Sequence, residues 1–402
     1  MSAENPAAVK VKETAVSPTS LIMSEPLKHL VHEHLWEFDS DFKKMEAYMF
    51  NSRGMTEFGH ARQTFKNHLC GTFALCAAWG LPRAVNRCGL FHTTYSGDLF
   101  RFCVLRSESS EDRATLRGVI GEDAERLVHL FGSVRRQKVM DHIFENGSLP
   151  DSMQVPLNRE TDKKALESET VSVSSLNAAA IMMVTVADYL DQLTGCNAWK
   201  DIYQVEGEDQ VMLWPGSGKP GVAHHWLTKL AKASAPLLPC SVPPAVFENC
   251  TGTITEEDET TARDLYWDVV RDDDDKKMSE EQKEEALRKC IQLNRFVGEP
   301  HTLLAQILFR KGLHAEASAE CQQALRKMYA MCTAWDKRMP WNEWVCFTRI
   351  TWLRSARLSR GLPEDFPRRE NGLCVLEEMV EEIEKLEKEG QEKEETRGRQ
   401  AG

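Results

Sequence analysis

Two histidines and one distant aspartate have the residue types that hold a divalent transition metal. His68 and His92 are 92 − 68 = 24 residues apart, and Asp188 lies in a segment that is otherwise apolar. A carboxylate buried alone among apolar side chains is costly unless a cation or hydrogen-bond donors offset its charge. Two imidazoles and one carboxylate suit Mn, Fe or Zn and leave coordination positions open. The alternative is that both histidines are core residues, hydrogen-bonded to Asp188 or to Thr93.

Two predicted helices position the histidines. Residues 64–79 place apolar side chains at helical spacing around His68, and Gly80-Leu81-Pro82 ends that helix. Residues 82–91 form a second buried helix, and His92 stands at its end. One helix, a turn and a second helix therefore separate the imidazoles, which allows both to enter one space between helices.

A later helix carries the aspartate. Residues 174–192 are largely apolar and end in acidic residues, and another helix begins within 115–131. No sustained alternation of polar and apolar residues occurs between residues 26 and 193. We therefore expect an all-α fold.

The order and spacing of these residues resemble the HD superfamily of helical metal-dependent phosphohydrolases, which includes guanosine-tetraphosphate hydrolases. That family has a histidine, then a His-Asp pair at a helix end, and finally an aspartate in an Ala-Asp-x-Leu-like helix. His68, His92 and Asp188 match these positions, whereas Thr93 replaces the paired aspartate. The segment also resembles an HD-like family of unestablished activity that has Ser or Thr after the second histidine. That second resemblance covers most of residues 55–360.

Further side chains are candidates for roles around such a metal. Asp98 and His60 are the candidate catalytic residues. Asp98, six residues after His92, is a candidate substitute ligand or base, and His60 is a candidate outer-shell or substrate-side group. Tyr95 is a candidate donor to a leaving group, with packing as the alternative. Because guanidinium groups match phosphate and carboxylate geometry, three arginines are candidate substrate-binding residues, with surface salt bridges as the alternative: Arg62, Arg117 and Arg159.

A C-terminal helical arm is predicted from a repeat-like pattern. The 34 residues Gly298–Met331 place small side chains where a tetratricopeptide helix pair requires them, namely at Ala305, Gly312, Ala317 and Ala324. The expected organisation is a disordered tail, an HD-like helical domain, an irregular linker, a tetratricopeptide-like region and a polar tail, at residues 1–25, 26–204, 205–254, 255–390 and 391–402. Such an arm offers a surface for a protein partner.

Composition limits the function classes. The 402 residues carry 50 Lys+Arg and 62 Asp+Glu, a net charge of −12, which argues against a nucleic-acid-binding protein. No apolar run reaches the length of a membrane span. The twelve cysteines are scattered and form no C-x-x-C pair, so we expect reduced thiols and a cytoplasmic location.

Three functions remain open. The first is an HD-like metal-dependent hydrolase of a small phosphorylated or anionic molecule. The second is a non-catalytic ligand-sensing or protein-interaction protein with a degenerate HD core, favoured by Thr93 and by the arm. The third is a metal-dependent oxygenase, because two histidines and one carboxylate also hold Fe(II).

Overall fold

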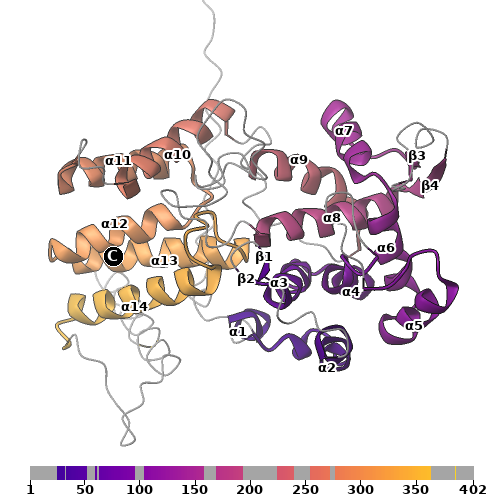
Figure 1. Ribbon diagram of the computed structural model, residues 1–402. Coiled ribbons are helices and arrows are strands. Elements are labelled where there is room, and N and C mark those ends of the chain that lie inside the picture. Colours follow the sequence, from indigo (N-terminus) through magenta and orange to yellow (C-terminus); the bar gives the residue numbers. More distant parts are fainter. Residues whose placement is uncertain are drawn as a thin grey trace, which may run out of the picture. The chain divides into compact units, whose positions relative to one another are not determined.

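The prediction of an all-α fold is confirmed. A computed structural model describes residues 25–31, 33–51, 59–60, 63–95, 104–157, 169–192, 224–239, 254–271, 277–363 and 385. Most of these residues are helical, and the strands among them form two small antiparallel pairs, β1–β2 and β3–β4 (Figure 1). Residues 1–24 and the polar tail 391–402 lie outside the described residues, so the predictions for them stay predictions.

The first part of the chain forms short elements and then a helical bundle. The short elements are α1 (Glu25–Val31), a 3-10 turn (Leu35–Glu37), α2 (Phe42–Glu46), a π turn (Ala47–Asn51), β1 (Gly59–His60) and β2 (Gln63–Thr64). The bundle helices are α3 (Phe65–Ala78), α4 (Arg83–Phe91), α5 (Ser110–Ile120), α6 (Glu122–Ser133), α7 (Arg136–Asn146), α8 (Ser175–Gln192) and α9 (His224–Ser234). The strands β3 (Ser152–Pro156) and β4 (Thr170–Ser174) form a hairpin before α8.

Local sequence explains where α3 begins and ends. The Thr64 hydroxyl accepts a hydrogen bond from the Asn67 backbone N–H, which caps the first turn. At the other end, the Leu81 N–H donates to the Cys76 carbonyl and the chain turns at Gly80. Pro82 then precedes α4, as the spacing predicts.

Helix α8 is the centre of the bundle core. Its residues from Ala178 to Val184 are all buried, and the helix packs against α3, α4, α6, α7 and α9. Each fully buried aliphatic side chain of this kind stabilises the fold by about 1.5–3 kcal/mol relative to an exposed one. A polar side chain between Ala178 and Asp188 on α8 is thus largely removed from water.

Three local predictions differ from the structure. The helix expected to begin within 115–131 is divided into α5 and α6 at Gly121, whose φ of +90° favours glycine. Residues 170–174 do alternate, with Val173 buried between exposed serines, and they form β4. The stretch 205–254, expected to be irregular, contains α9, which packs on α7 and α8.

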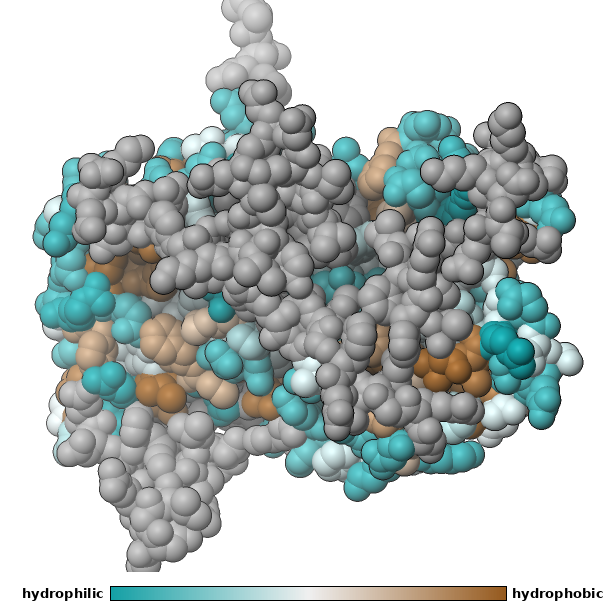
Figure 2. All heavy atoms as spheres, in the orientation of Figure 1, coloured by the Kyte–Doolittle hydropathy of each residue, from teal (hydrophilic) through white to brown (hydrophobic). Residues whose placement is uncertain are grey.

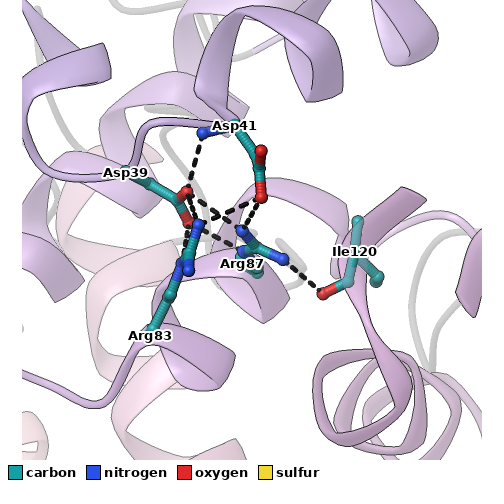
Figure 3. Close-up of polar contacts among 5 residues, drawn as sticks. All are labelled: Asp39, Asp41, Arg83, Arg87 and Ile120. Carbon is teal, nitrogen blue, oxygen red and sulfur yellow. Dashed lines mark hydrogen bonds and ion pairs between the residues drawn. The ribbon is translucent and has the colours of Figure 1, made fainter. Parts of the chain in front are cut away.

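A buried ion-pair network joins the early turn to the bundle. Asp39 is 3% exposed, and its carboxylate accepts hydrogen bonds from the guanidinium groups of Arg83 and Arg87 on α4 (Figure 3). Arg87 also donates to Asp41 and, over 2.8 Å, to the carbonyl of Ile120 at the end of α5. The network therefore fixes α4, on which the second histidine depends.

The C-terminal arm is a series of helices that pack sequentially. They are α10 (Glu256–Arg271), α11 (Glu280–Leu293), α12 (Glu299–Arg310), α13 (His314–Met331) and α14 (Trp341–Ser359), and α12, α13 and α14 lie side by side (Figure 1). The predicted helix pair over 298–331 is present as α12 and α13. Small residues allow these helices to approach closely, since Ala305, Ala317 and Ala324 are fully buried.

The surface that the described residues form has both polar and apolar regions. On the face in Figure 2 the coloured outer edges are mostly hydrophilic, and hydrophobic residues appear in separate patches. Among the described residues, large apolar side chains that are clearly exposed include Phe144, Leu237, Phe347 and Ile350. None of the helices in the described part of the chain combines the length and apolar character that a membrane span requires.

Candidate metal centre

Three helices bring the two histidines and the aspartate together. His68 lies on the first turn of α3, His92 directly follows α4, and Asp188 lies near the end of α8. The Nε2 atoms of His68 and His92 lie 3.2 Å and 3.5 Å from the same oxygen, Oδ1 of Asp188. One ligand atom from each residue lies within 4.8 Å of the others. Ligands bound to one ion by bonds of about 2.0–2.2 Å have separations in this range.

The second nitrogen of each imidazole is held by a partner. His68 Nδ1 lies 2.7 Å from Oδ2 of Asp191, and His92 Nδ1 lies 2.8 Å from the carbonyl oxygen of Gly89. A proton on Nδ1 of each ring satisfies both contacts and turns the two Nε2 lone pairs toward Asp188. Metal-binding histidines characteristically have such a carboxylate or carbonyl behind the ring. The donor set therefore fits a divalent ion.

The carboxylates of Asp188 and Asp191 favour a positive charge on the His68 imidazole or next to it. Although burial opposes it, hydrogen bonds to Asp188 and Asp191 raise the pKa of His68 to about 9. Burial raises the pKa of Asp188, but His92 and His68 outweigh it and hold that pKa well below its usual value. Either a proton on His68 or a metal cation at its Nε2 atom can balance the negative charge of these carboxylates. The cluster can thus form either a structural ion pair or a metal site.

Other groups complete the surroundings of Asp188. Gln192 donates a hydrogen bond to its Oδ1, and Nη1 of Arg136 lies 4.0 Å from its Oδ2. Arg136 also donates to the Thr185 hydroxyl over 3.1 Å and stacks 3.8 Å above the ring centre of Phe131. The guanidinium is therefore fixed beside the carboxylate.

Two predicted substrate-binding residues meet at another carboxylate. The Tyr95 hydroxyl donates to Glu125 over 3.0 Å, and Nε of Arg117 lies 3.3 Å from Glu125. Arg113 binds Glu125 through two nitrogens, at 2.7 Å and 3.1 Å. Glu125 is only 2% exposed, so these donors balance a buried charge. The role of Tyr95 and Arg117 in binding a substrate stays a prediction.

The remaining candidates cannot be placed. Arg62, Asp98 and Arg159 lie outside the described residues. His60 belongs to β1, but its side chain is also outside the described part. Their predicted roles therefore stay predictions.

Sequence reasoning missed Asp191 and Arg136. Asp191 follows Asp188 by three residues, a spacing that puts two side chains on one face of a helix, and this signal was available. Arg136 gives no such signal, because its proximity to Asp188 depends on the packing of α7 against α8.

The fold and the cluster together define a mainly α-helical protein with a buried His-His-Asp group. At the level of families, residues 49–136 match a model described as a domain of unknown function (DUF6817). The match includes His68 and His92 and ends before Asp188, so the candidate centre extends beyond the matched segment. No curated protein and no solved structure matches this chain.

Proposed function

We propose that this protein is a metal-dependent hydrolase of a small phosphorylated or otherwise anionic molecule, with an HD-like centre formed by His68, His92 and Asp188. One observation carries the proposal: two imidazole Nε2 atoms face the same buried carboxylate oxygen, at 3.2 Å and 3.5 Å, while both Nδ1 atoms have other partners. A histidine that only fills the core does not require a second imidazole on the same carboxylate oxygen. Two imidazoles that converge on one carboxylate oxygen are typical of a metal-ligand set.

The residues of the centre have distinct roles in this proposal. His68 and His92 hold the ion through Nε2, and Asp188 adds a carboxylate ligand. When bound, the ion supplies Lewis-acid chemistry, polarising the substrate and making hydroxide available from water near neutral pH. The charges of a divalent ion and Arg136 exceed those of Asp188 and Asp191, so the loaded centre attracts an anion.

A second candidate function is that of a non-catalytic ligand-sensing or protein-interaction protein. Thr93 occupies the position of the paired aspartate in the HD pattern, and its buried hydroxyl has no hydrogen-bond partner among the described residues. Arg117 and Tyr95 already compensate Glu125. In this case the helices α10–α14 would carry a protein partner. An oxygenase remains the third candidate and requires iron.

Metal binding by the full-length protein tests the proposal. We expect purified protein to contain Mn, Fe or Zn, and the chelator-treated protein to melt at a higher temperature after one of these ions is restored. His92→Gln abolishes that shift, whereas His129→Gln, a change at a partly buried histidine elsewhere in the same bundle, preserves it. Wild-type protein without bound metal and without any ion-dependent shift would overturn the proposal.

Activity separates the three candidates. The hydrolase releases phosphate from at least one member of a panel of nucleoside phosphates and small phosphoesters, and His92→Gln does not. Metal binding without turnover favours the sensing protein, and turnover that consumes dioxygen with iron alone favours the oxygenase. The cytoplasmic location also stays a proposal, supported by free thiols at Cys70, Cys76, Cys88, Cys290, Cys321, Cys332 and Cys346.

A further inference from the structure

We infer that Asp191 is a positioning residue that orients His68 toward the metal, and that Gly71 leaves the space that the Asp191 carboxylate occupies. The inference rests on the proposed metal centre and deepens it. Asp191 lies on α8, three residues after Asp188, so one helix face supplies both a ligand and the group behind another ligand.

The contact is short and largely removed from water. Oδ2 of Asp191 lies 2.7 Å from Nδ1 of His68, and the two side chains are 13% and 1% exposed. In such surroundings a hydrogen bond between an imidazole and a carboxylate is strong and directional. Asp191 therefore fixes the proton on Nδ1, makes Nε2 the ligand atom and raises its basicity.

Gly71 provides the space in which Asp191 reaches His68. It lies on α3, three residues after His68, on the same face of the helix. A Cβ atom at this position would lie 1.9 Å from Oδ1 and 2.7 Å from Cγ of Asp191. No real Cβ makes such contacts, so any side chain at position 71 displaces the carboxylate. A side chain at position 71 would thus act directly on the position of the Asp191 carboxylate.

The two histidines differ in a way that isolates this effect. His92 Nδ1 faces a neutral backbone carbonyl, that of Gly89, which no side-chain substitution removes. His68 faces a charged side chain, which a substitution can neutralise. A loss of the carboxylate should therefore weaken one ligand of the centre and leave the other two unchanged.

Metal affinity measured on the full-length protein tests the inference. We expect Asp191→Asn to weaken the binding of Zn²⁺, measured by competition with a chelator, by about 10–100-fold. It should also alter the visible absorption spectrum of bound Co²⁺, because the His68 ligand changes. Asp191→Glu, which retains the carboxylate, recovers part of the affinity. A purely structural role for Asp191 would lower the melting temperature without moving the Co²⁺ spectrum.

Gly71→Ala provides an independent test with a matched control. It should weaken Zn²⁺ binding as much as Asp191→Asn does, and the double variant should be no weaker than either single variant. Gly118→Ala is the control, because Gly118 is also helical and a Cβ there meets nothing within 4 Å. Gly118→Ala leaves the affinity unchanged.

The outcomes separate this inference from the proposed function. Wild-type protein that binds no metal overturns both. Wild-type protein that binds Zn²⁺ with the same affinity as folded Asp191→Asn and Gly71→Ala overturns the positioning role alone. If Asp191→Asn fails to fold, Asp191→Glu and Gly71→Ala decide the question through the same affinity and the same Co²⁺ spectrum.

Discussion

Buried carboxylates in two regions of this molecule are compensated in different ways. In the bundle, Asp188 is 6% exposed and faces two imidazoles. In the arm, Asp336 is completely buried and faces the guanidinium of Arg338 and the hydroxyl of Tyr266, the latter at 2.5 Å. Arginine is always protonated, so the Asp336 cluster has its positive charge built in. The two imidazoles that face Asp188 are charged only when they bind a proton.

The same contrast exists within the bundle. Asp39 is paired with Arg83 and Arg87, and Glu125 is paired with Arg113 and Arg117. Although burial raises the pKa of Asp39, Arg87 and Arg83 hold that pKa well below its usual range. Such pairs gain nothing from a metal ion, because their charges are already balanced.

The difference indicates what makes a buried carboxylate a ligand. An imidazole can exchange its proton for a metal, whereas a guanidinium offers no lone pair at any accessible pH. In the described part of the chain, the guanidinium contact of Asp188 is a long one, with Nη1 of Arg136 at 4.0 Å. Asp188 therefore combines a buried negative charge with neighbours that can join it as ligands.

The largest expected effects come from neutralising one carboxylate of each kind. Asp188→Asn should weaken Zn²⁺ binding by at least about 100-fold, because a charged ligand is lost. Asp39→Asn should instead lower the free energy of unfolding by about 3–5 kcal/mol, because two arginines lose their buried partner. Chelator competition and urea unfolding of both variants measure the two effects.

The comparison fails if the effects are exchanged. Weakened Zn²⁺ binding in folded Asp39→Asn would mean that the network in Figure 3 acts on the metal centre through α4 and His92. Unchanged Zn²⁺ binding in Asp188→Asn would mean that the histidine cluster is a structural ion pair.

How much of this centre is predictable from sequence depends on how local its determinants are. His68 and His92 flank a turn between two helices with strong start and stop signals, and an aspartate inside an apolar helix is uncommon. These features depend on residue type and helical period alone. They predicted the convergence of His68, His92 and Asp188 that the structure contains.

The partners of Tyr95 and Arg117 were not predictable in this way. Their meeting at Glu125 requires the break at Gly121, which turns α6 back along α5, and a glycine within an otherwise helical pattern does not specify that break. The hairpin β3–β4 was missed for a different reason. Its strands have five residues each, too few for alternation to be distinguished from helical spacing.

A buried carboxylate in the arm, that of Glu299, is held by backbone N–H groups and gives the next prediction. One oxygen of Glu299 accepts hydrogen bonds from the backbone N–H groups of Trp335 and Asp336, and the other has no hydrogen-bond partner within the described part of the chain. Burial, together with the charge of Asp336, raises the pKa of Glu299 to about 7. The folded state therefore retains a proton that the unfolded state, with an ordinary pKa near 4.5, has released.

This difference has a definite sign. Glu299 contributes stability below about pH 4.5, and that contribution is lost as pH rises toward 7, at a total of about 3 kcal/mol. Glu299→Gln keeps an oxygen for the two N–H groups and removes the titration. Urea unfolding from pH 5 to 8 should show a fall in the wild type that is smaller in Glu299→Gln. Parallel pH profiles would contradict the assignment.

The smallest expected effect compares two hydroxyl groups. Tyr266 and Tyr95 each donate to a buried carboxylate that arginine already balances, Asp336 and Glu125 respectively. Removing one donor by Tyr266→Phe or Tyr95→Phe should therefore cost about 1–2 kcal/mol of unfolding free energy, because the arginine contacts remain. Thermal or urea unfolding measures both variants.

Activity then distinguishes the two tyrosines. If Tyr95 acts only on Glu125, Tyr95→Phe and Tyr266→Phe leave phosphate release per folded molecule equal. If Tyr95 also contacts the substrate, as its position three residues after His92 predicts, Tyr95→Phe lowers turnover and Tyr266→Phe does not. Equal losses of stability with unequal activities would mean that the substrate-binding site reaches from the metal centre to Tyr95 and Glu125. Equal activities would place the Glu125 cluster with Asp39 and Asp336 among the structural ion pairs.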